Sequence, residues 1–353
     1  MTREQLFKQS IKVIKDGQHP TGGYVACPTF PTYNYSWFRD SAYIAYAMDL
    51  ASEHDSAARF HSWAVRNILA REKALEEYFS GGATDYKELL HTRYTLEGDE
   101  GTEEWENFQL DSFGIWLWSV KEHLSLSESK ADGPLIQAVN LVARYLTALW
   151  QTPCYDCWEE NEDKVHIYTL ATIYRGLICA SEISGTDYSK TVLAVKNRIE
   201  KSGCAEGHLV KYEGIRAVDS SLLGAGFPCF VFDPDHPVMD ATIKQIEADL
   251  LESGGLHRYR ADTYYGGGIW ILLTAWLGIN EVLRGNQDKA EHILDWILSK
   301  AGEDGHLPEQ LSEAMNDPSY LSHWNEKWGF SANPLLWSHA MYIILYMKLG
   351  LIK

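Results

Sequence analysis

Residues 270–279 read WILLTAWLGI, and residues 288–300, shortly after them, read DKAEHILDWILSK. The first stretch is apolar nearly all round, which is typical of a helix that is buried on every side. The second carries an apolar stripe and a charged face, as a helix does when one side meets water. Together the two stretches predict an inner helix followed by an outer helix that covers it.

The same alternation runs through the whole chain, with Gly, Pro and Asn/Asp clusters marking the turns between helices. The stretches REQLFKQSIKVIKD (3–16) and KTVLAVKNRIEKS (190–202) are amphipathic, whereas SAYIAYAMDLA (41–51) and LLWSHAMYIILYM (335–347) are apolar nearly all round. Twelve helices are predicted, alternately outer and inner: 3–16, 40–52, 55–79, 110–126, 134–150, 167–184, 188–202, 219–226, 237–253, 269–285, 287–301 and 335–349.

Six outer and six inner helices, joined in sequence by short connections, predict an all-α fold of the (α/α)6-barrel type. No linker or low-complexity segment interrupts the series, so residues 1–353 are expected to form a single domain. A helical solenoid requires units of fixed length, and the chain has no obvious fixed-period repeat.

The composition argues against several classes of protein. A formal net charge of −18 at pH 7 opposes binding to nucleic acid or to an acidic membrane surface. No run of about 18 apolar residues is present, and the N-terminal stretch MTREQLFKQSIKVIKDG lacks the apolar core of a signal peptide. We therefore expect a cytoplasmic protein with neither nucleic-acid nor membrane partners, while its oligomeric state stays open.

Cysteine usage fits a reducing compartment, because six cysteines are few for 353 residues and Cys179 lies within an apolar helical run. Cys154 and Cys157 have the spacing of a zinc or redox pair, but no second CxxC or HxxxH partner accompanies them. The sequence therefore predicts no metal site and no cofactor.

Aromatic, acidic and glycine-rich residues gather in the connections that precede the inner helices. In an alternating barrel all of these connections emerge at one end, so they are expected to form a common mouth. The 13 Trp and 20 Tyr exceed what core filling usually needs, and flat faces with polar rims suit sugar rings. The five stretches are YNYSWFRD (33–40), EEWENFQLD (103–111), WEEN (158–161), LHRYRADTYYGGGIW (256–270) and HLPEQ (306–310).

Glu159 and Glu309 lie in two of these connections, 150 positions apart. Glycoside hydrolysis needs one carboxyl group that protonates the leaving oxygen and a second that activates water or attacks the sugar. A neighbouring like charge raises a carboxyl pKa, so Glu160, and Glu309 as a second source of charge, are expected to help keep Glu159 protonated. Taken singly, each glutamate is also explained as a solvated loop residue or as a charge at a helix N-terminus.

Arg39 and Asp40 are adjacent, just before a predicted inner helix, and offer hydrogen-bond donors and acceptors to sugar hydroxyls. A local salt bridge between them is the alternative interpretation. The glycines at 266–268 are not part of a phosphate-binding motif, and we interpret them as a close approach of the backbone near the pocket.

Five motifs in this order resemble the glucoamylase family, glycoside hydrolase family 15: YNYSWFRD, WEEN followed by a Tyr-Thr-Leu helix, RYRADTYYGGGIW, HLPEQ and NPLLWSHA. The similarity extends from about residue 22 to the C-terminus. The resemblance implies an (α/α)6 barrel and an inverting, exo-acting α-glucosidase that releases β-glucose from non-reducing ends.

The resemblance also implies roles for individual residues. Glu159 would be the general acid, and Glu309 would be the general base that activates water. The remaining matched residues would bind substrate. Tyr33, Trp37, Arg39, Asp40 and Arg258 are implied at the terminal glucose, and Glu160, Trp270 and Trp337 at the next sugar or the pocket wall. Trp158 is also expected to bind substrate.

The chain departs from the family pattern after WEEN, where it reads EDKVHIYT instead of a glycine before the helix, so the loop that carries Glu160 is expected to differ in shape. The β-sandwich of secreted bacterial members and the starch-binding module of fungal ones have no counterpart, so we expect a short oligosaccharide substrate, isomaltose-like or malto-type. Two alternatives remain: an α,α-trehalase on the same barrel, and a non-catalytic sugar sensor, which the presence of both carboxylates disfavours.

Overall fold

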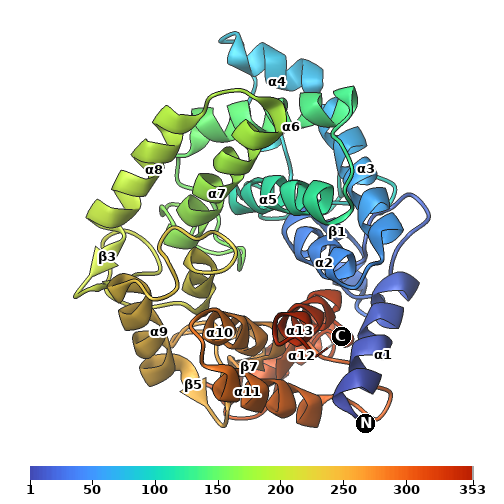
Figure 1. Ribbon diagram of the computed structural model, residues 1–353, viewed down its shortest axis with the longest axis vertical. Coiled ribbons are helices and arrows are strands. Elements are labelled where there is room, and N and C mark those ends of the chain that lie inside the picture. Colours follow the sequence, from blue (N-terminus) through green and yellow to red (C-terminus); the bar gives the residue numbers. More distant parts are fainter. Residues whose placement is uncertain (352–353) are drawn as a thin grey trace.

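Six helical segments form a closed inner ring in the computed structural model, which describes residues 1–351 (Figure 1). Each member contacts the next one along the chain, and the last member returns to contact the first, which closes the ring. In chain order the ring consists of α2 (Phe38–Leu50), α5 (Asp111–Leu126), α7 (Ile167–Ser184), the 3-10 helix η3 (Ser220–Ala225), α10 (Ile271–Leu283) and α13 (Leu336–Lys348).

Six outer helices surround this ring, and each precedes an inner segment in the chain (Figure 1). Burial follows the predicted pattern: residues 271–281 of α10 are all buried, whereas only Ala290, Ile293, Leu294 and Ile297 of α11 are. The (α/α)6 barrel expected from the sequence is confirmed. The outer helices are α1 (Arg3–Asp16), α3 (His54–Ala70), α6 (Gly133–Leu149), α8 (Ser189–Ser202), α9 (Pro237–Leu250) and α11 (Gln287–Lys300).

Two predicted helices differ from the structure. The segment 55–79 is interrupted at Arg71, which separates α3 from α4 (Glu72–Phe79) and lies with its guanidinium 4.2 Å from the ring centroid of Tyr94. The segment 219–226 is the 3-10 helix η3. A Cβ on Gly224 would lie 2.4 Å from the ring of Tyr168, so this ring packs directly against the backbone of the segment. The sequence predicted an α-helix here.

An additional helix, α12 (Leu321–Trp328), lies between α11 and α13 and was not predicted. None of its residues is buried, although Leu321, Trp324 and Trp328 recur at helical spacing. It contacts the 3-10 helix η4 (Tyr264–Gly266). The remaining 3-10 helices are η1 (Pro31–Tyr33), η2 (Tyr86–Glu88) and η5 (Pro318–Tyr320).

Short two-residue strands pair within single connections and between different ones. β1 (Ser36–Trp37) pairs with β2 (Arg93–Tyr94), and β3 (Cys204–Ala205) pairs with β4 (His208–Leu209). A four-stranded antiparallel sheet consists of β5 (Leu251–Glu252), β6 (Gly255–Leu256), β7 (Ile269–Trp270) and β8 (Gln310–Leu311). Trp270 is the register partner of Gln310, so this sheet places the start of α10 beside the loop that carries Glu309.

The inner helices α5 and α7 approach each other closely through two glycines. A Cβ on Gly114 would lie 2.5 Å from the backbone of Thr172, and a Cβ on Gly176 would lie 2.7 Å from the carbonyl oxygen of Gly114. Across the described residues, no helix is both long enough and apolar enough to span a membrane.

Candidate active site

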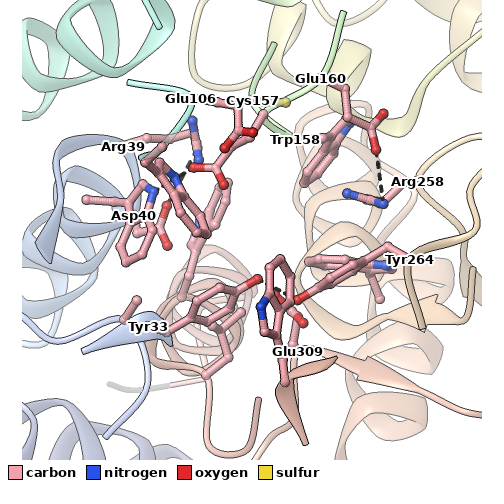
Figure 2. A pocket seen from close by; sticks show the side chains of 18 of the residues that line it. Tyr33, Arg39, Asp40, Glu106, Cys157, Trp158, Glu160, Arg258, Tyr264 and Glu309 are labelled. Atoms are coloured by element: carbon pink, nitrogen blue, oxygen red, sulfur yellow. Dashed lines mark hydrogen bonds and ion pairs between the residues drawn. The ribbon is translucent and has the colours of Figure 1, made fainter. Parts of the chain in front are cut away.

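The connections that lead into the inner helices surround a cavity of about 380 Å³. This volume lies within the range of roughly 300–1,000 Å³ that small-molecule sites occupy. Figure 2 shows side chains from several parts of the barrel pointing toward one open centre. All eleven residues that the sequence predicted as catalytic or substrate-binding line the cavity: Tyr33, Trp37, Arg39, Asp40, Trp158, Glu159, Glu160, Arg258, Trp270, Glu309 and Trp337.

Arg39 and Asp40 lie in the first turn of α2 and are both nearly buried. Arg39 Nε is 3.5 Å from Asp40 Oδ1, so the local ion pair that was the alternative interpretation is present, and Nη1 reaches Asp111 Oδ2 at 3.2 Å. Burial raises the pKa of Asp40 to about 7, against the lowering effect of Arg39. Arg39 Nε and Asp40 Oδ1 have no hydrogen-bond partner among residues 1–351, so a donor and an acceptor are left for a polar ligand.

Glu159 is fixed by two donors from other connections. Trp37 Nε1 donates to Glu159 Oε1 at 2.8 Å, and Gln109 Nε2 donates to the same oxygen at 3.3 Å. The amide oxygen of Gln109 accepts from Arg39 Nη1 at 2.6 Å, and because an arginine can only donate, this contact orients the amide toward Glu159. Gln109 lies within the stretch 103–111 that the sequence singled out, yet its role was not predicted.

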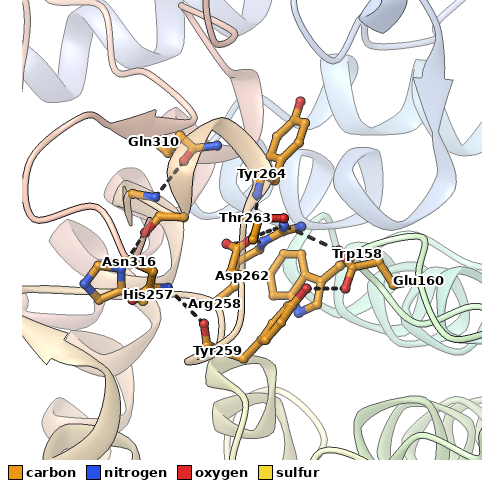
Figure 3. Close-up of polar contacts among 12 residues, drawn as sticks. Trp158, Glu160, His257, Arg258, Tyr259, Asp262, Thr263, Tyr264, Gln310 and Asn316 are labelled. Atoms are coloured by element: carbon orange, nitrogen blue, oxygen red, sulfur yellow. Dashed lines mark hydrogen bonds and ion pairs between the residues drawn. The ribbon is translucent and has the colours of Figure 1, made fainter. Parts of the chain in front are cut away.

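Glu160 faces a different set of partners, although it follows Glu159 directly. Glu159 has a φ of 69°, in the left-handed region, so the chain turns sharply between the two side chains. The hydroxyl of Tyr259 donates to Glu160 Oε2 at 2.5 Å, and Arg258 Nη2 is 3.6 Å from Oε1 (Figure 3). The two carboxylates therefore do not form the adjacent pair that the sequence predicted.

Arg258 is held rigidly by a buried carboxylate. Its Nε donates to Asp262 Oδ2 at 2.8 Å, and its Nη2 bonds to the other oxygen of Asp262 (Figure 3). The same guanidinium lies 5.1 Å from the ring centroid of Trp270 and 5.4 Å from that of Trp158. Arg258 therefore presents a fixed positive charge between two aromatic rings and Glu160.

A buried lysine, Lys211, contacts the acidic side chains that hold the WEEN loop. Lys211 Nζ lies 3.1 Å from Asp219 Oδ2, 3.3 Å from Asp156 Oδ2 and 3.8 Å from Glu160 Oε2. Asp156 Oδ1 accepts the backbone N–H groups of Trp158 and Glu160, and Asp219 accepts from Trp158 Nε1 at 3.0 Å. Burial by itself lowers the pKa of Lys211, but Asp219 and Asp156 outweigh it and raise the pKa above its usual value.

Glu309 enters the cavity from the loop that precedes β8 and is only 3% exposed. Its backbone N–H donates to the carbonyl of Ala332 at 2.9 Å, and Ser331 Oγ donates to its carboxylate at 3.4 Å. Burial raises the pKa of Glu309 to about 8, and a hydrogen bond from Tyr33 and the charge of Arg258 counteract only part of this effect. Burial and then the carboxylate of Glu309 also raise the pKa of Tyr33.

Aromatic rings form much of the remaining wall. The Tyr33 and Trp37 rings meet edge to face at 5.5 Å, the Trp158 and Trp270 rings are 5.5 Å apart, and the Tyr33 hydroxyl is 2.8 Å from that of Tyr264. Several lining residues were not predicted from the sequence. Trp105, Glu106 and Tyr264 belong to stretches that were singled out, whereas Trp324, Lys327 and Trp328 come from the unpredicted helix α12.

The glycines at 266–268 allow the close backbone approach that we expected. A Cβ on Gly267 would lie 2.2 Å from the carbonyl oxygen of Asp262, and a Cβ on Gly268 would lie 2.1 Å from that of Leu311. Gly268 N also donates to Gln310 Oε1 at 3.0 Å (Figure 3). Any side chain here would push apart the loops that carry Arg258 and Glu309.

Cys154 and Cys157 are both buried, and Cys157 lines the cavity. Burial raises the pKa of the Cys154 thiol to about 12 and that of Cys157 well above its usual value, which disfavours the thiolate form that binds metals.

The cavity as a whole combines carboxyl groups, a fixed guanidinium and aromatic faces, a set suited to acid–base chemistry on a sugar.

Comparison with known proteins agrees with this arrangement. The sequence profile of the Glycosyl hydrolases family 15 matches residues 1–347. The isomaltose glucohydrolase of Kribbella flavida is 38% identical over 367 aligned residues, which cover 99% of this chain and 93% of that relative. The trehalase of Thermoplasma volcanium is more distant, with 24% identity over 86% of this chain and 54% of its own length.

Solved structures give the same result. A glycosidase variant in complex with glucose superposes with a TM-score of 0.94 at 35% identity, covering 99% of this chain and 98% of that one. A bacterial glucoamylase complexed with acarbose shares the fold, with a TM-score of 0.73 at 19% identity over 98% of this chain and 55% of that one. Because the family profile spans nearly the whole chain and a relative with 38% identity covers 99% of it, this protein is a glycoside hydrolase that belongs to the Glycosyl hydrolases family 15.

Proposed function

We propose that the protein is an inverting, exo-acting α-glucosidase that releases β-glucose from the non-reducing end of short α-glucosides. The observation that carries this proposal is the presence of Glu159 and Glu309, from separate loops, in one cavity. Packed aromatic rings close the inner end of the cavity and form its floor. The Tyr43 ring stacks 5.4 Å from Trp337, and the buried rings of Trp118 and Trp276 pack against Tyr43. A floored cavity admits a chain end and excludes the middle of a chain.

The proposed reaction uses the two carboxyl groups in different ways. Glu159 donates its proton to the glycosidic oxygen as the bond from that oxygen to C1 breaks. Glu309 accepts a proton from a water molecule whose oxygen attacks C1 from the opposite face. Attack from that face converts an α-linked glucose into β-glucose, and two carboxyls in this mechanism lie roughly 6.5–9.5 Å apart to leave room for the water.

Unpartnered polar atoms support the binding of a sugar in particular. Arg39 Nε, Asp40 Oδ1, Trp270 Nε1 and Trp337 Nε1 are all buried without a hydrogen-bond partner among the described residues. Donors and an acceptor in one aromatic-lined cavity match the alternating hydroxyls and apolar faces of a glucose ring. Buried polar groups gain most from a ligand that completes their hydrogen bonds, so a polyol is favoured over an apolar ligand.

The pKa of Glu309 favours a second assignment of the two roles. A carboxyl group with a pKa of about 8 is largely protonated at neutral pH, which is the state of a general acid. In the reversed assignment Glu309 would donate the proton and Glu159 would activate the water. We retain Glu159 as the acid because it lies in the WEEN motif that the family resemblance identifies, and the following experiment separates the two assignments.

The test compares Glu159→Gln and Glu309→Gln on two substrates. Each variant is expected to lower turnover of an isomaltose-type substrate by roughly 10²–10⁴-fold, the usual effect of losing a general acid or base. With α-glucosyl fluoride, whose leaving group needs little protonation, Glu159→Gln should retain much more activity than Glu309→Gln. The opposite order would show that the roles are reversed. Glu303→Gln, an exposed change six residues before Glu309, is the matched control and should be fully active.

The product and the substrate are tested separately. NMR of the first-formed sugar should show β-glucose, and α-glucose at that stage would indicate a nucleophile in place of a base.

A panel of isomaltose, maltose, panose, dextran, starch and trehalose then decides the linkage. We expect the short α-1,6 or α-1,4 substrates to be turned over best, as the similarity to the Kribbella isomaltose glucohydrolase favours. Activity on trehalose alone would favour a trehalase, and inactivity of a folded protein on every sugar would favour a sensor.

A further inference from the structure

Three side chains that carry potential metal ligands meet away from the proposed active site. Asp49 lies near the end of α2, His123 near the end of α5, and His61 in the middle of α3, and all three are buried. Asp40, at the cavity, and Asp49 are nine residues apart on one helix, which corresponds to about 13 Å along its axis. The cluster therefore lies toward the end of the barrel opposite the cavity.

The three side chains are close enough to share a ligand. One ligand atom from each lies within 4.8 Å of the others. His123 Nδ1 is 3.0 Å from both carboxylate oxygens of Asp49, and the rings of His61 and His123 are 4.9 Å apart with an interplanar angle of 38°. A fourth residue, His54, places its Nδ1 2.8 Å from Asp49 Oδ1 and is partly exposed, so it lies between the cluster and solvent.

His61 is the member that ordinary packing does not explain. It is only 4% exposed, and neither of its ring nitrogens has a hydrogen-bond partner among residues 1–351. Buried polar groups are normally paired, and an unpaired one destabilises the folded state. A neutral imidazole has one ring nitrogen with a free lone pair, so an unpaired ring at this position can bind a cation.

We propose that Asp49, His61 and His123 form a binding site for a divalent transition-metal ion, with zinc as the ion that best fits two imidazoles and one carboxylate. Zinc binds such ligands at about 2.0–2.1 Å in tetrahedral geometry, which places two ligand atoms about 3.3 Å apart. The 3.0 Å separation of His123 Nδ1 and Asp49 is close to this value, and a ligand atom of His61 lies within 4.8 Å of both, so His61 has to move closer when the ion binds. Calcium and magnesium prefer oxygen ligands and fit less well.

The expected effect of this ion is on stability. The site joins two adjacent members of the inner ring, α2 and α5, to the outer helix α3. An ion that binds only the folded chain raises the midpoint of thermal unfolding, whereas the distance from Asp40 leaves glucose release unchanged. The proposal does not depend on the substrate or mechanism proposed above.

The first experiment titrates zinc into chelator-stripped full-length protein in competition with a chromophoric chelator. We expect one equivalent to bind, and the midpoint of thermal unfolding to rise by about 4 °C when free zinc exceeds its Kd a hundredfold. Cobalt(II) in place of zinc should give visible absorption bands without the near-ultraviolet bands of a cobalt–thiolate bond. Those thiolate bands would assign the metal to cysteines and overturn the proposal, as would the absence of any binding.

The second experiment uses variants of the cluster. His61→Leu removes one ligand together with its unpaired nitrogens, so the metal-free variant should unfold no earlier than the parent, yet zinc should no longer raise its midpoint. Asp49→Asn should weaken zinc binding at least tenfold. The control His292→Leu changes an exposed histidine on α11 and should respond to zinc as the parent does. An undiminished zinc response in His61→Leu would refute the site, and the cobalt spectrum of the parent decides the question if a variant fails to fold.

Discussion

Glu309 shows at the scale of one residue how burial sets the chemistry of the cavity. The side chain is nearly removed from water, and the loss of hydration raises its pKa to about 8. Asp40 responds in the same way, with a pKa of about 7. Two acidic groups of the cavity are thus partly protonated near neutral pH, although each ionises in water at about pH 4.

The pKa of Glu309 predicts the pH dependence of kcat/KM. The general base must be ionised while the general acid is protonated, so kcat/KM on an α-glucoside should pass through an optimum and fall on both sides of it. The pKa of Glu309 predicts that one limb of this profile lies near pH 8. The measurement is a pH profile at substrate concentrations far below KM. A profile without a limb near pH 8 would show that the fold does not raise the pKa of Glu309.

Lys211 is a positioning residue, because it touches the loop that carries the proposed acid and does not line the cavity. Without its ammonium group, Asp156 and Asp219 would be buried side by side with no compensating charge. Their hydrogen bonds hold the backbone of the WEEN loop and the indole of Trp158. The position of Glu159 therefore depends on a lysine 52 residues further along the chain.

We expect Lys211→Met to lower kcat/KM on an α-glucoside roughly 100-fold, as a displacement of about 1 Å in a catalytic group does. Lys211→Arg, which keeps the charge, should recover part of the loss. The exposed change Lys190→Met on α8 serves as the control and should leave kcat/KM unaltered. An unchanged kcat/KM in a folded Lys211→Met protein would show that the loop keeps its shape without the lysine.

At the scale of elements, the contact between α5 and α7 depends on the absence of side chains. Gly114 and Gly176 face each other so closely that added Cβ atoms would meet backbone atoms, which cannot move aside as a side chain can. The residues near the start of the two helices reach the proposed active site: Asp111 on α5 contacts Arg39, and the WEEN loop leads into α7. The spacing of these helices therefore bears on the geometry of the site.

Gly176→Ala is expected to lower the free energy of unfolding by roughly 1–3 kcal/mol, because the helices must separate to accept the methyl group. Gly133→Ala at the start of α6 is the matched control, since a Cβ there would meet nothing within 4 Å. Urea denaturation of both variants and the parent measures the difference. Equal stability of Gly176→Ala and the parent would mean that α5 and α7 can move apart without cost.

At the scale of the whole molecule, His339 connects the first and last helices to the loop that carries Glu309. Its Nε2 accepts from the backbone N–H of Leu307 at 3.1 Å, so Nδ1 holds the proton and donates to Ser10 Oγ of α1 at 2.9 Å. Burial, with nearby His306, lowers the pKa of His339 to about 3.

The buried residues form one contiguous core from Leu6 to Leu349. The single-domain organisation stays a prediction, which a single cooperative unfolding transition would support.

His339→Leu should lower the free energy of unfolding by roughly 1–3 kcal/mol, because the N–H of Leu307 loses its buried acceptor. The parent should also lose stability as the pH falls. In the unfolded chain this histidine takes up a proton below about pH 6.5, whereas in the folded chain it stays neutral to about pH 3, so acidification favours unfolding between these values. Urea denaturation across this pH range should show a shallower dependence in His339→Leu, and an identical dependence would contradict the assignment.

The sequence by itself determined the two-layer barrel and eleven of the residues that line its mouth. Helix periodicity reports whether one or all faces of a helix are buried, and this local property alternates along the chain without reference to any other segment. The same alternation sends every outer-to-inner connection to one end of the barrel. Glu159 and Glu309 were therefore expected in one site although 150 positions separate them, and both line the cavity.

Only the tertiary structure decided which side chains within that mouth and around it interact. The break at Arg71, the 3-10 helix η3, the amide of Gln109 that orients toward Glu159 and the buried Lys211 all depend on neighbours from distant parts of the chain. The Asp49, His61 and His123 cluster likewise comes from three helices, and no spacing in the sequence marks it. Hydrophobic pattern specifies which face of a helix is buried, whereas the partner of a buried polar group is fixed by close packing in three dimensions.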